Sequence, residues 1–239
     1  MSRKRSVLFV GLFAASLIAC SDPAADVPSA KVDSAKPVNR PTSSASAKTS
    51  AAGSTAAPTA SAAPNVDAPE KPANAVPFSN SNSTIAFTGT KKIGKHEGKF
   101  EKFDGWISMD ADKPESARIW VEIDLASVKT DSGDLDKHLQ QEHFFWVEKM
   151  PKATFESTSI KAGGEKGATH TVEGNFGLRM LSKSLSFPAT VKVTADEISA
   201  TSAFSLNRKT WELKYDGKAD NLINDLVEIK LDIKAPRKK

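Results

Sequence analysis

The chain has 239 residues, enough for one domain and a leader, with 33 Lys and Arg against 29 Asp and Glu. Arg3, Lys4 and Arg5 account for most of the basic excess, and residues 77–239 hold 25 basic and 24 acidic residues. This balance disfavours nucleic-acid binding, which needs a basic surface, and a single cysteine excludes an internal disulfide.

Residues 1–19 have the pattern of an export signal. Three basic residues precede the uncharged apolar run Val7–Ile18, which is too short to cross about 30 Å of hydrocarbon. The sequence Leu17-Ile18-Ala19-Cys20 resembles the bacterial lipobox, and that resemblance implies cleavage before Cys20 and its modification by acyl chains such as palmitate. We therefore expect a lipoprotein that faces the periplasm, and Ser21 in place of Asp favours the outer membrane.

The segment from Cys20 to residue 76 is expected to be a disordered tether. Ala, Ser, Pro, Thr and Lys dominate it, and residues 21–76 contain no Leu, Ile, Met or aromatic residue. Such a chain has almost nothing to bury against the entropy lost on ordering. A flexible chain of this length spans roughly 40 Å root-mean-square, and the folded domain is expected to occupy residues 77–239.

Alternation of apolar and polar residues predicts an all-β domain of eight strands. In the last of them, Val227, Ile229, Leu231 and Ile233 alternate with charged residues. The predicted strands are 85–90, 100–109, 118–125, 153–160, 171–178, 185–193, 198–206 and 227–234. One short helix or long loop is expected near 130–142, capped by Asp131 or Ser132. Antiparallel strands with one apolar face each must close into a barrel or sandwich.

Several segments, in order, resemble the YceI-like family of bacterial envelope proteins, also called polyisoprenoid-binding. Asp136–Leu139 resembles the family's D-x-H-L segment, and Phe144–Phe155 resembles its F-F-D-V-x-x-Y-P-x-A-T-F segment. Further similar segments are 83–87, 98–105, 121–130, 187–190 and 204–208. The resemblance implies an eight-stranded antiparallel lipocalin-like barrel that encloses an elongated cavity for an isoprenoid or another long-chain lipid.

Strand alternation then selects candidate cavity residues. Five phenylalanines on separate strands are expected to face one interior and line the ligand path: Phe87, Phe155, Phe176, Phe187 and Phe204. Each could instead be ordinary core packing. Arg208 could meet a lipid head group at the cavity mouth or form a structural ion pair at a strand end.

The chain departs from the family pattern at three places. Trp146 and Met150 replace Asp and Tyr of the central segment, which removes hydrogen bonds that those side chains could make. Met180–Lys183 replaces a Gly-Val-Thr-Lys turn, so a residue suited to positive φ is less available there.

Other kinds of chemistry have weak candidates. His138 and His143 are five residues apart, which matches no common zinc pattern. The acids Asp131, Asp134, Asp136 and Glu142 lack the spacing of a calcium loop and are expected to be solvated. Nucleotide and nucleophile motifs are missing from the sequence. We expect no metal, no cofactor other than a bound lipid, and no enzymatic activity.

Two functions remain open from the sequence. The first is a membrane-tethered periplasmic carrier or store for a long-chain isoprenoid or other lipid. The second is a non-enzymatic envelope scaffold whose barrel is filled and whose outer surface meets a partner.

Overall fold

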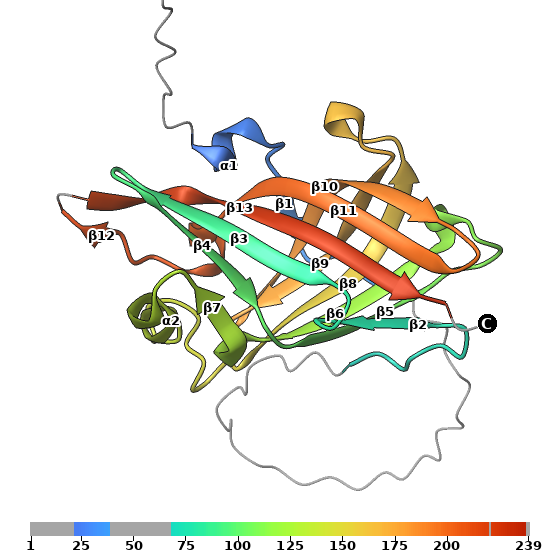
Figure 1. Cartoon of the computed structure of the whole chain (residues 1–239), viewed down its shortest axis with the longest axis horizontal. Helices are drawn as coiled ribbons and strands as arrows, with labels where there is room; N and C mark the ends of the chain where they lie inside the picture. Colours follow the sequence, from blue (N-terminus) through green and yellow to red (C-terminus); the bar gives the residue numbers. More distant parts are fainter. Residues whose placement is uncertain (1–21, 39–67, 220, 238–239) are drawn as a thin grey trace, which may run out of the picture.

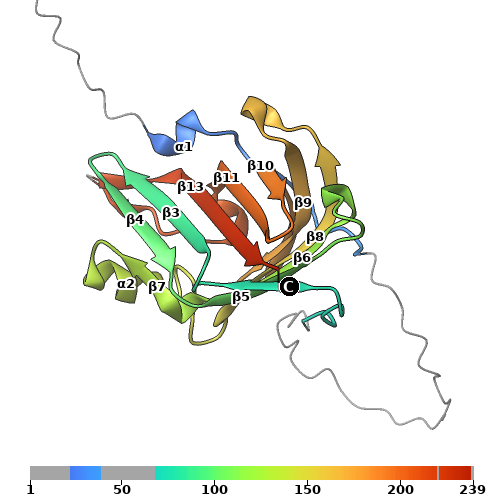
Figure 2. The same ribbon diagram turned by 45° about the vertical axis from the view of Figure 1, so that its right-hand side comes forward.

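The computed structural model describes residues 22–38, 68–219 and 221–237. A long antiparallel sheet curls into a half-barrel, with β13 and β3 on one side and β8, β9 and β10 curving round the other (Figures 1 and 2). Along the sheet the strand order is β2-β5-β6-β8-β9-β10-β11-β13-β3-β4-β7, while β1 pairs with β10 and β12 pairs with β13. The strands are β1 Lys31–Ser34, β2 Val76–Ser79, β3 Thr84–Lys91, β4 Lys95–Phe100, β5 Phe103–Ser108, β6 Arg118–Asp124, β7 Val128–Thr130, β8 Lys152–Ala162, β9 His170–Leu178, β10 Leu181–Val193, β11 Glu197–Asn207, β12 Gly217–Lys218 and β13 Asn221–Pro236.

The prediction of an all-β, lipocalin-like fold is confirmed, but the predicted barrel of eight strands is wrong, because the sheet forms a half-barrel with more strands (Figure 2). Eleven strands follow one another along the sheet. Strands β2, β7 and β12 have two to four residues, too few to show alternation. The expected strand 100–109 is instead divided at Glu101 and Lys102, whose backbone N–H groups donate to Ser127 O and Ser127 Oγ. These bonds bend the chain from β4 into β5.

Helices contribute little to the fold. The described helices are α1 Pro23–Asp26 and α2 Gly133–Leu139, with the short 3₁₀ turns η1 Pro114–Ser116, η2 Leu125–Ser127, η3 Glu165–Gly167 and η4 Arg208–Trp211. Helix α2 lies within the predicted interval 130–142, and the Ser132 side chain caps it by accepting from the Leu135 N–H group at 3.5 Å. None of the helices in the described ranges is long and apolar enough to span a bilayer.

The expectation of a disordered tether is wrong for residues 22–38, which pack on the outside of the sheet. Strand β1 pairs with residues 183–186 of β10, and Ser29 pairs with Ser205 of β11. The segment fits between β10 and β11 because their ladder ends at the pair of Thr190 with Thr201. Pro188, two residues away on β10, has no N–H group with which to extend the ladder. Backbone pairing therefore orders a segment that has no large apolar side chain to bury.

Residues 22–38 also cover polar residues of β10 and β11. Ser184 of β10 and Ser205 of β11 are each only 1% exposed, as is Ala24 of α1. Beyond β1, Asn175 exchanges two hydrogen bonds with the backbone of Lys36. The predicted export signal, Cys20 and the central part of the predicted tether, residues 39–67, lie outside the described residues.

Candidate functional site

One end of the half-barrel contains an apolar cavity of about 500 Å³. Its apolar lining comes from strands that face each other across the half-barrel and from the segments that carry α2 and η4. The principal apolar residues are Phe87, Phe100, Leu125, Leu135, Leu139, Phe144, Phe145, Phe176, Leu178, Leu206, Trp211, Leu213, Val227 and Ile229. This volume falls within the range of about 300–1,000 Å³ typical of small-molecule sites.

Aromatic rings form two neighbouring walls of the cavity. The rings of Phe87 and Phe145 both lie within 6 Å of the Phe100 ring, at 5.8 and 5.9 Å between centroids. On the other wall, Phe176 and Trp211 meet edge to face at 5.3 Å, and the Trp211 indole N–H donates to Phe176 O. The indole of Trp211 is fully buried and lies in the lining of the cavity.

A glycine allows Phe87 to adopt its position. Gly98 on β4 is paired with Phe87 on β3, and a Cβ atom at position 98 would lie 2.4 Å from Phe87 Cζ. The bare backbone at Gly98 therefore lets the ring lie across the neighbouring strand.

The cavity opens to solvent at the strand ends. Polar, exposed or half-buried residues complete its lining on this side: Lys91, His96, Lys218 and Asn221. His138 and Tyr215 also line it, and their rings meet edge to face at 4.9 Å between centroids. The site thus combines an apolar, aromatic interior with a polar rim.

The predicted ligand path of five phenylalanines differs from the structure. Phe87 and Phe176 line the cavity, whereas Phe155, Phe187 and Phe204 lie outside its lining. Phe187 stacks on Phe204 at 4.5 Å and meets Phe155 at 5.8 Å. Phe187 and Phe204 belong to the buried core and Phe155 packs against it, so these rings fill part of the interior outside the cavity.

Arg208 lines the cavity, but its guanidinium is used by the chain itself. Its Nε and Nη2 atoms donate to the carbonyl oxygens of Asn224 and Ile223 at 3.0 and 3.3 Å, and Nη1 donates to Leu213 O. Asp225 and Asp216 lie 3.5 and 3.8 Å from Nη2. Burial lowers the pKa of Arg208 and the two acids oppose this shift. These contacts fit the structural ion pair, one of the two roles considered for this residue.

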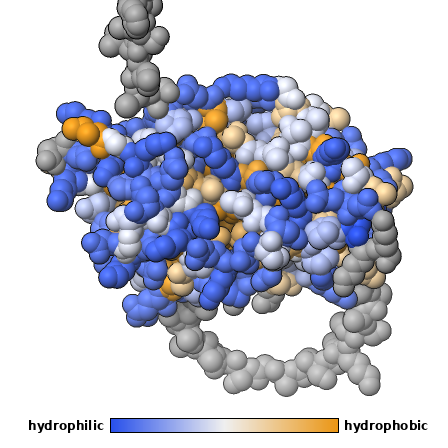
Figure 3. Space-filling view, viewed as in Figure 1, coloured by the Kyte–Doolittle hydropathy of each residue, from blue (hydrophilic) through white to orange (hydrophobic). Residues whose placement is uncertain are grey.

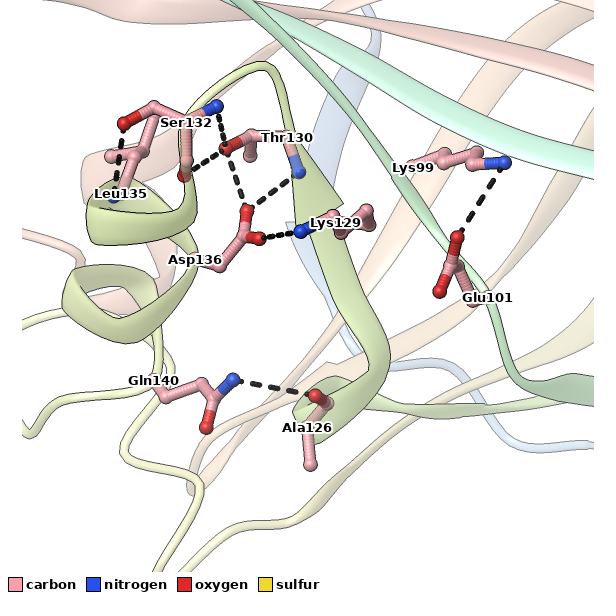
Figure 4. Close-up of polar contacts among 9 residues, drawn as sticks. All are labelled: Lys99, Glu101, Ala126, Lys129, Thr130, Ser132, Leu135, Asp136 and Gln140. Carbon is pink, nitrogen blue, oxygen red and sulfur yellow. Dashed lines mark hydrogen bonds and ion pairs between the residues drawn. The ribbon is translucent and has the colours of Figure 1, made fainter.

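Helix α2 is fixed to the sheet by Asp136 of the D-x-H-L segment (Figure 4). Its carboxylate accepts from Lys129 Nζ at 2.8 Å, the Thr130 hydroxyl at 2.7 Å and the Thr130 N–H group at 2.6 Å. The bonds from Lys129 and Thr130 hold the pKa of Asp136 below its ordinary value, against the opposing effect of burial. Because Leu135, His138 and Leu139 of α2 line the cavity, this carboxylate positions one wall of the site.

Replacing Asp136 with Ala should lower the free energy of unfolding by about 1–3 kcal/mol, since the half-buried N–H and hydroxyl groups of Thr130 lose their acceptor. Asp134→Ala, at an exposed position on the same helix, is the control. Because the folded-state pKa of Asp136 is depressed, its stabilisation is present above the unfolded pKa of about 3.9 and is lost as the pH falls below it. Denaturant titrations at pH 7 and pH 3 measure this, and equal losses at both pH values would contradict it.

Arg179, on the β9–β10 turn, connects the segment after α2 with the end of η4. Its Nη1 atom donates to Phe144 O at 3.0 Å and to Glu212 O at 2.7 Å, and its guanidinium carbon lies 5.8 Å from the centre of the Trp146 ring. Arg179 and Trp146 both have positive φ, 58° and 53°. The β9–β10 turn therefore does use positive φ, at Arg179, although the sequence offers no glycine there.

His143 lies beside His138 at 4.7 Å between ring centroids. Burial lowers the pKa of His143, the charges of His138 and Arg179 lower it further, and Glu142 raises it. Its Nε2 atom is buried and has no hydrogen-bond partner among the described residues. Within those residues, no three His, Cys, Asp or Glu side chains gather closely enough to hold a metal ion.

Most of the cavity-lining residues were not predicted from the sequence. Trp211, Phe100 and Phe145 line the cavity, yet only the adjacent pair Phe144-Phe145 carried a signal, through the family segment. Trp211 lies on a short 3₁₀ turn between strands, where no periodicity predicts its direction.

The curled antiparallel sheet around an apolar cavity defines a protein of lipocalin-like architecture. The chain belongs to the YceI-like family, because the model of the YceI-like domain matches residues 77–235. Curated relatives include UPF0312 proteins of Azotobacter vinelandii and of Pseudomonas savastanoi, each 41% identical to this chain over 86 and 93 residues. These matches cover 36% and 39% of this chain and 44% and 47% of the relatives. The aligned part is thus less than half the length of either relative.

Solved structures share the fold at low sequence identity. BcnA of Burkholderia cenocepacia superposes with a TM-score of 0.58 and 20% identity, covering 66% of this chain and 99% of that protein. A polyisoprenoid binding domain from Saccharophagus degradans gives a TM-score of 0.55 at 16% identity, covering 69% and 99%. The YCEI protein of Campylobacter jejuni gives 0.52 at 21%, covering 59% and 85%.

Proposed function

We propose that the protein is a membrane-tethered periplasmic binding protein that carries or stores a long-chain isoprenoid or another lipid. The observation that carries this proposal is the open apolar cavity of about 500 Å³ between the aromatic walls. The polyisoprenoid binding of the Saccharophagus degradans domain supports the same ligand class. In this proposal the protein acts by binding and catalyses no reaction, and its only small-molecule partner is the lipid.

A filled-barrel scaffold is the second candidate. The stacked rings of Phe187 and Phe204, with Phe155 beside them, show that part of the interior is packed. A scaffold would use its outer surface and leave the remaining cavity without a ligand. The two functions therefore differ in whether occupation of the cavity matters.

Filling the cavity from Gly89 should abolish lipid binding. Gly89 lies two residues after Phe87 on β3 and lines the cavity, and a Cβ atom built there has nothing within 4 Å. Gly89→Phe should therefore displace ligand with little loss of stability, whereas Gly133→Phe, at an exposed position with equally open space, should leave binding unchanged. The measurement is titration with a fluorescent long-chain lipid, and unchanged affinity of the Gly89 variant would contradict the proposal.

Tethering rests on the lipobox at Cys20 and is tested separately. Cys20→Ala should remove the acylation site, so the chain should no longer incorporate labelled palmitate and should stay as a precursor of higher apparent mass. Incorporation equal to that of the parent would refute the anchor while leaving the cavity proposal intact.

A further inference from the structure

Two exposed apolar side chains lie together at one tip of the half-barrel. We define the mouth tip as residues 91–95, between β3 and β4, together with residues 217–219 and 221–223 around β12 and the start of β13. Ile93 is 73% exposed and Leu222 is 51% exposed. The Lys92 N–H group donates to Leu222 O at 3.0 Å, and the Ile93 N–H group donates to Asn221 Oδ1 at 3.0 Å. These bonds hold the two segments, which carry the exposed apolar side chains, beside each other.

The mouth tip is also where the cavity opens. Lys91, Gly217, Lys218, Asn221 and Ile223 belong both to the tip and to the lining of the cavity. In the space-filling view an apolar patch stands out at the left end, over the tip where Figure 1 shows the β3–β4 turn and β12 (Figure 3). An exposed apolar cluster at the entrance of the cavity is well placed to insert into a membrane, which would be the source of a lipid ligand.

Lysines surround this apolar pair. The turn 91–95 contains Lys91, Lys92 and Lys95 and no acid, and Lys218 lies on the adjacent β12. Three of the described acids near the tip have cationic partners: Glu97 pairs with Lys95, and Asp216 and Asp225 pair with Lys209 and Arg208. A fourth, Asp22, accepts hydrogen bonds from Thr90 and Asn224. Asp220 also belongs to this stretch of sequence and lies outside the described residues. Apolar side chains with a basic surround are the pattern that binds anionic lipid surfaces.

The N-terminal segment joins the domain beside the same tip. Asp22 accepts from the Thr90 hydroxyl at 3.2 Å and from Asn224 Nδ2 at 2.9 Å, on β3 and β13. Only Ser21 separates Asp22 from Cys20, so an acylated Cys20 would be joined to this point by at most about 7 Å of backbone. An anchor this short would hold the tip close to the membrane.

We propose that the mouth tip docks on the surface of an anionic phospholipid bilayer, with Ile93 and Leu222 inserted and the lysines at the head groups. The cavity mouth then faces the bilayer, and a lipid passes between the two without crossing water. The purpose of this docking rests on the proposed lipid binding, whereas docking itself is measurable on protein without ligand.

The test is flotation of the chain that begins at Ser21, which contains every residue the structure describes and lacks Cys20. Vesicles of phosphatidylethanolamine with phosphatidylglycerol should carry the protein upward, and vesicles of phosphatidylcholine alone should carry much less. Replacing Ile93 and Leu222 together by Ser should reduce the partition constant roughly tenfold or more. On anionic vesicles, Lys92→Glu and Lys218→Glu together should lower the partition constant by roughly fivefold or more for each residue. High salt should also lower the partition constant of the parent.

Met180→Ser is the matched control, because Met180 is 48% exposed but lies on the β9–β10 turn. Unfolding midpoints should stay unchanged in all these variants, since the positions are exposed. The proposal is overturned if the parent does not float, if the Ile93 and Leu222 variant floats like the parent, or if Met180→Ser loses as much. Lipid extracted from the same preparations tests ligand binding independently, so loss of docking and loss of ligand are distinguished.

Discussion

Replacing Phe204 with Ala should lower the free energy of unfolding by about 3–5 kcal/mol, the range for a large side chain removed from a packed core. Phe204 is 2% exposed and stacks on Phe187 at 4.5 Å. Phe87→Ala should have a smaller effect on stability, because one side of that ring faces open cavity. It should, however, change the amount of lipid retained, whereas Phe204→Ala should retain lipid.

Urea titration of both variants, followed by quantification of retained lipid, separates packing from binding. The two proteins lose the same side-chain atoms, so the comparison isolates the environment of each ring. Equal losses of stability, with no change of lipid in either variant, would show that the interior is a filled core at both positions and would favour the scaffold.

Ala30→Pro should detach the N-terminal segment from the sheet. The Ala30 N–H group donates to Ser205 O at 2.8 Å, and the Ser205 N–H group donates to Pro28 O at 2.9 Å. Proline removes the first bond and leaves a buried carbonyl without its partner, so the free energy of unfolding should fall by about 1–3 kcal/mol. Hydrogen exchange at Ser205 and along residues 29–34 should become faster.

Ala30→Gly keeps the N–H group and is the matched control. It should retain slow exchange at Ser205 and show only the small loss of stability expected from the greater backbone freedom of glycine. If the amides of residues 29–34 exchange at the parent rate in Ala30→Pro, pairing of the N-terminal segment with β10 and β11 is not what protects them.

Elements with strong local signals were predictable from the sequence. The alternation of Ile229, Leu231 and Ile233 with charged residues locates β13, and Ser132 capping Leu135 locates the start of α2. The family segments further indicated an apolar cavity, and the cavity does contain Phe87 and Phe176. In each case the deciding interaction lies within a few residues along the chain or follows from strand alternation.

Features that depend on distant partners were not predictable. Residues 22–38 are ordered by strand edges more than 140 residues away, which composition does not reveal. The division of the interior follows from strand register, because the stacked pair Phe187 and Phe204 fills one region while the bare Gly89 leaves space in another. Alternation predicts that a side chain faces inward but not whether a neighbour already occupies that space.

The most direct test of the account is native mass spectrometry of the purified protein, followed by organic extraction. The open cavity and its aromatic walls predict that the parent carries one long-chain lipid of the isoprenoid type or a related class, and that Gly89→Phe, folded with a similar unfolding midpoint, carries none. A parent protein that is always free of lipid, and that binds none when long-chain lipids are added, would contradict the account and leave the scaffold function in its place.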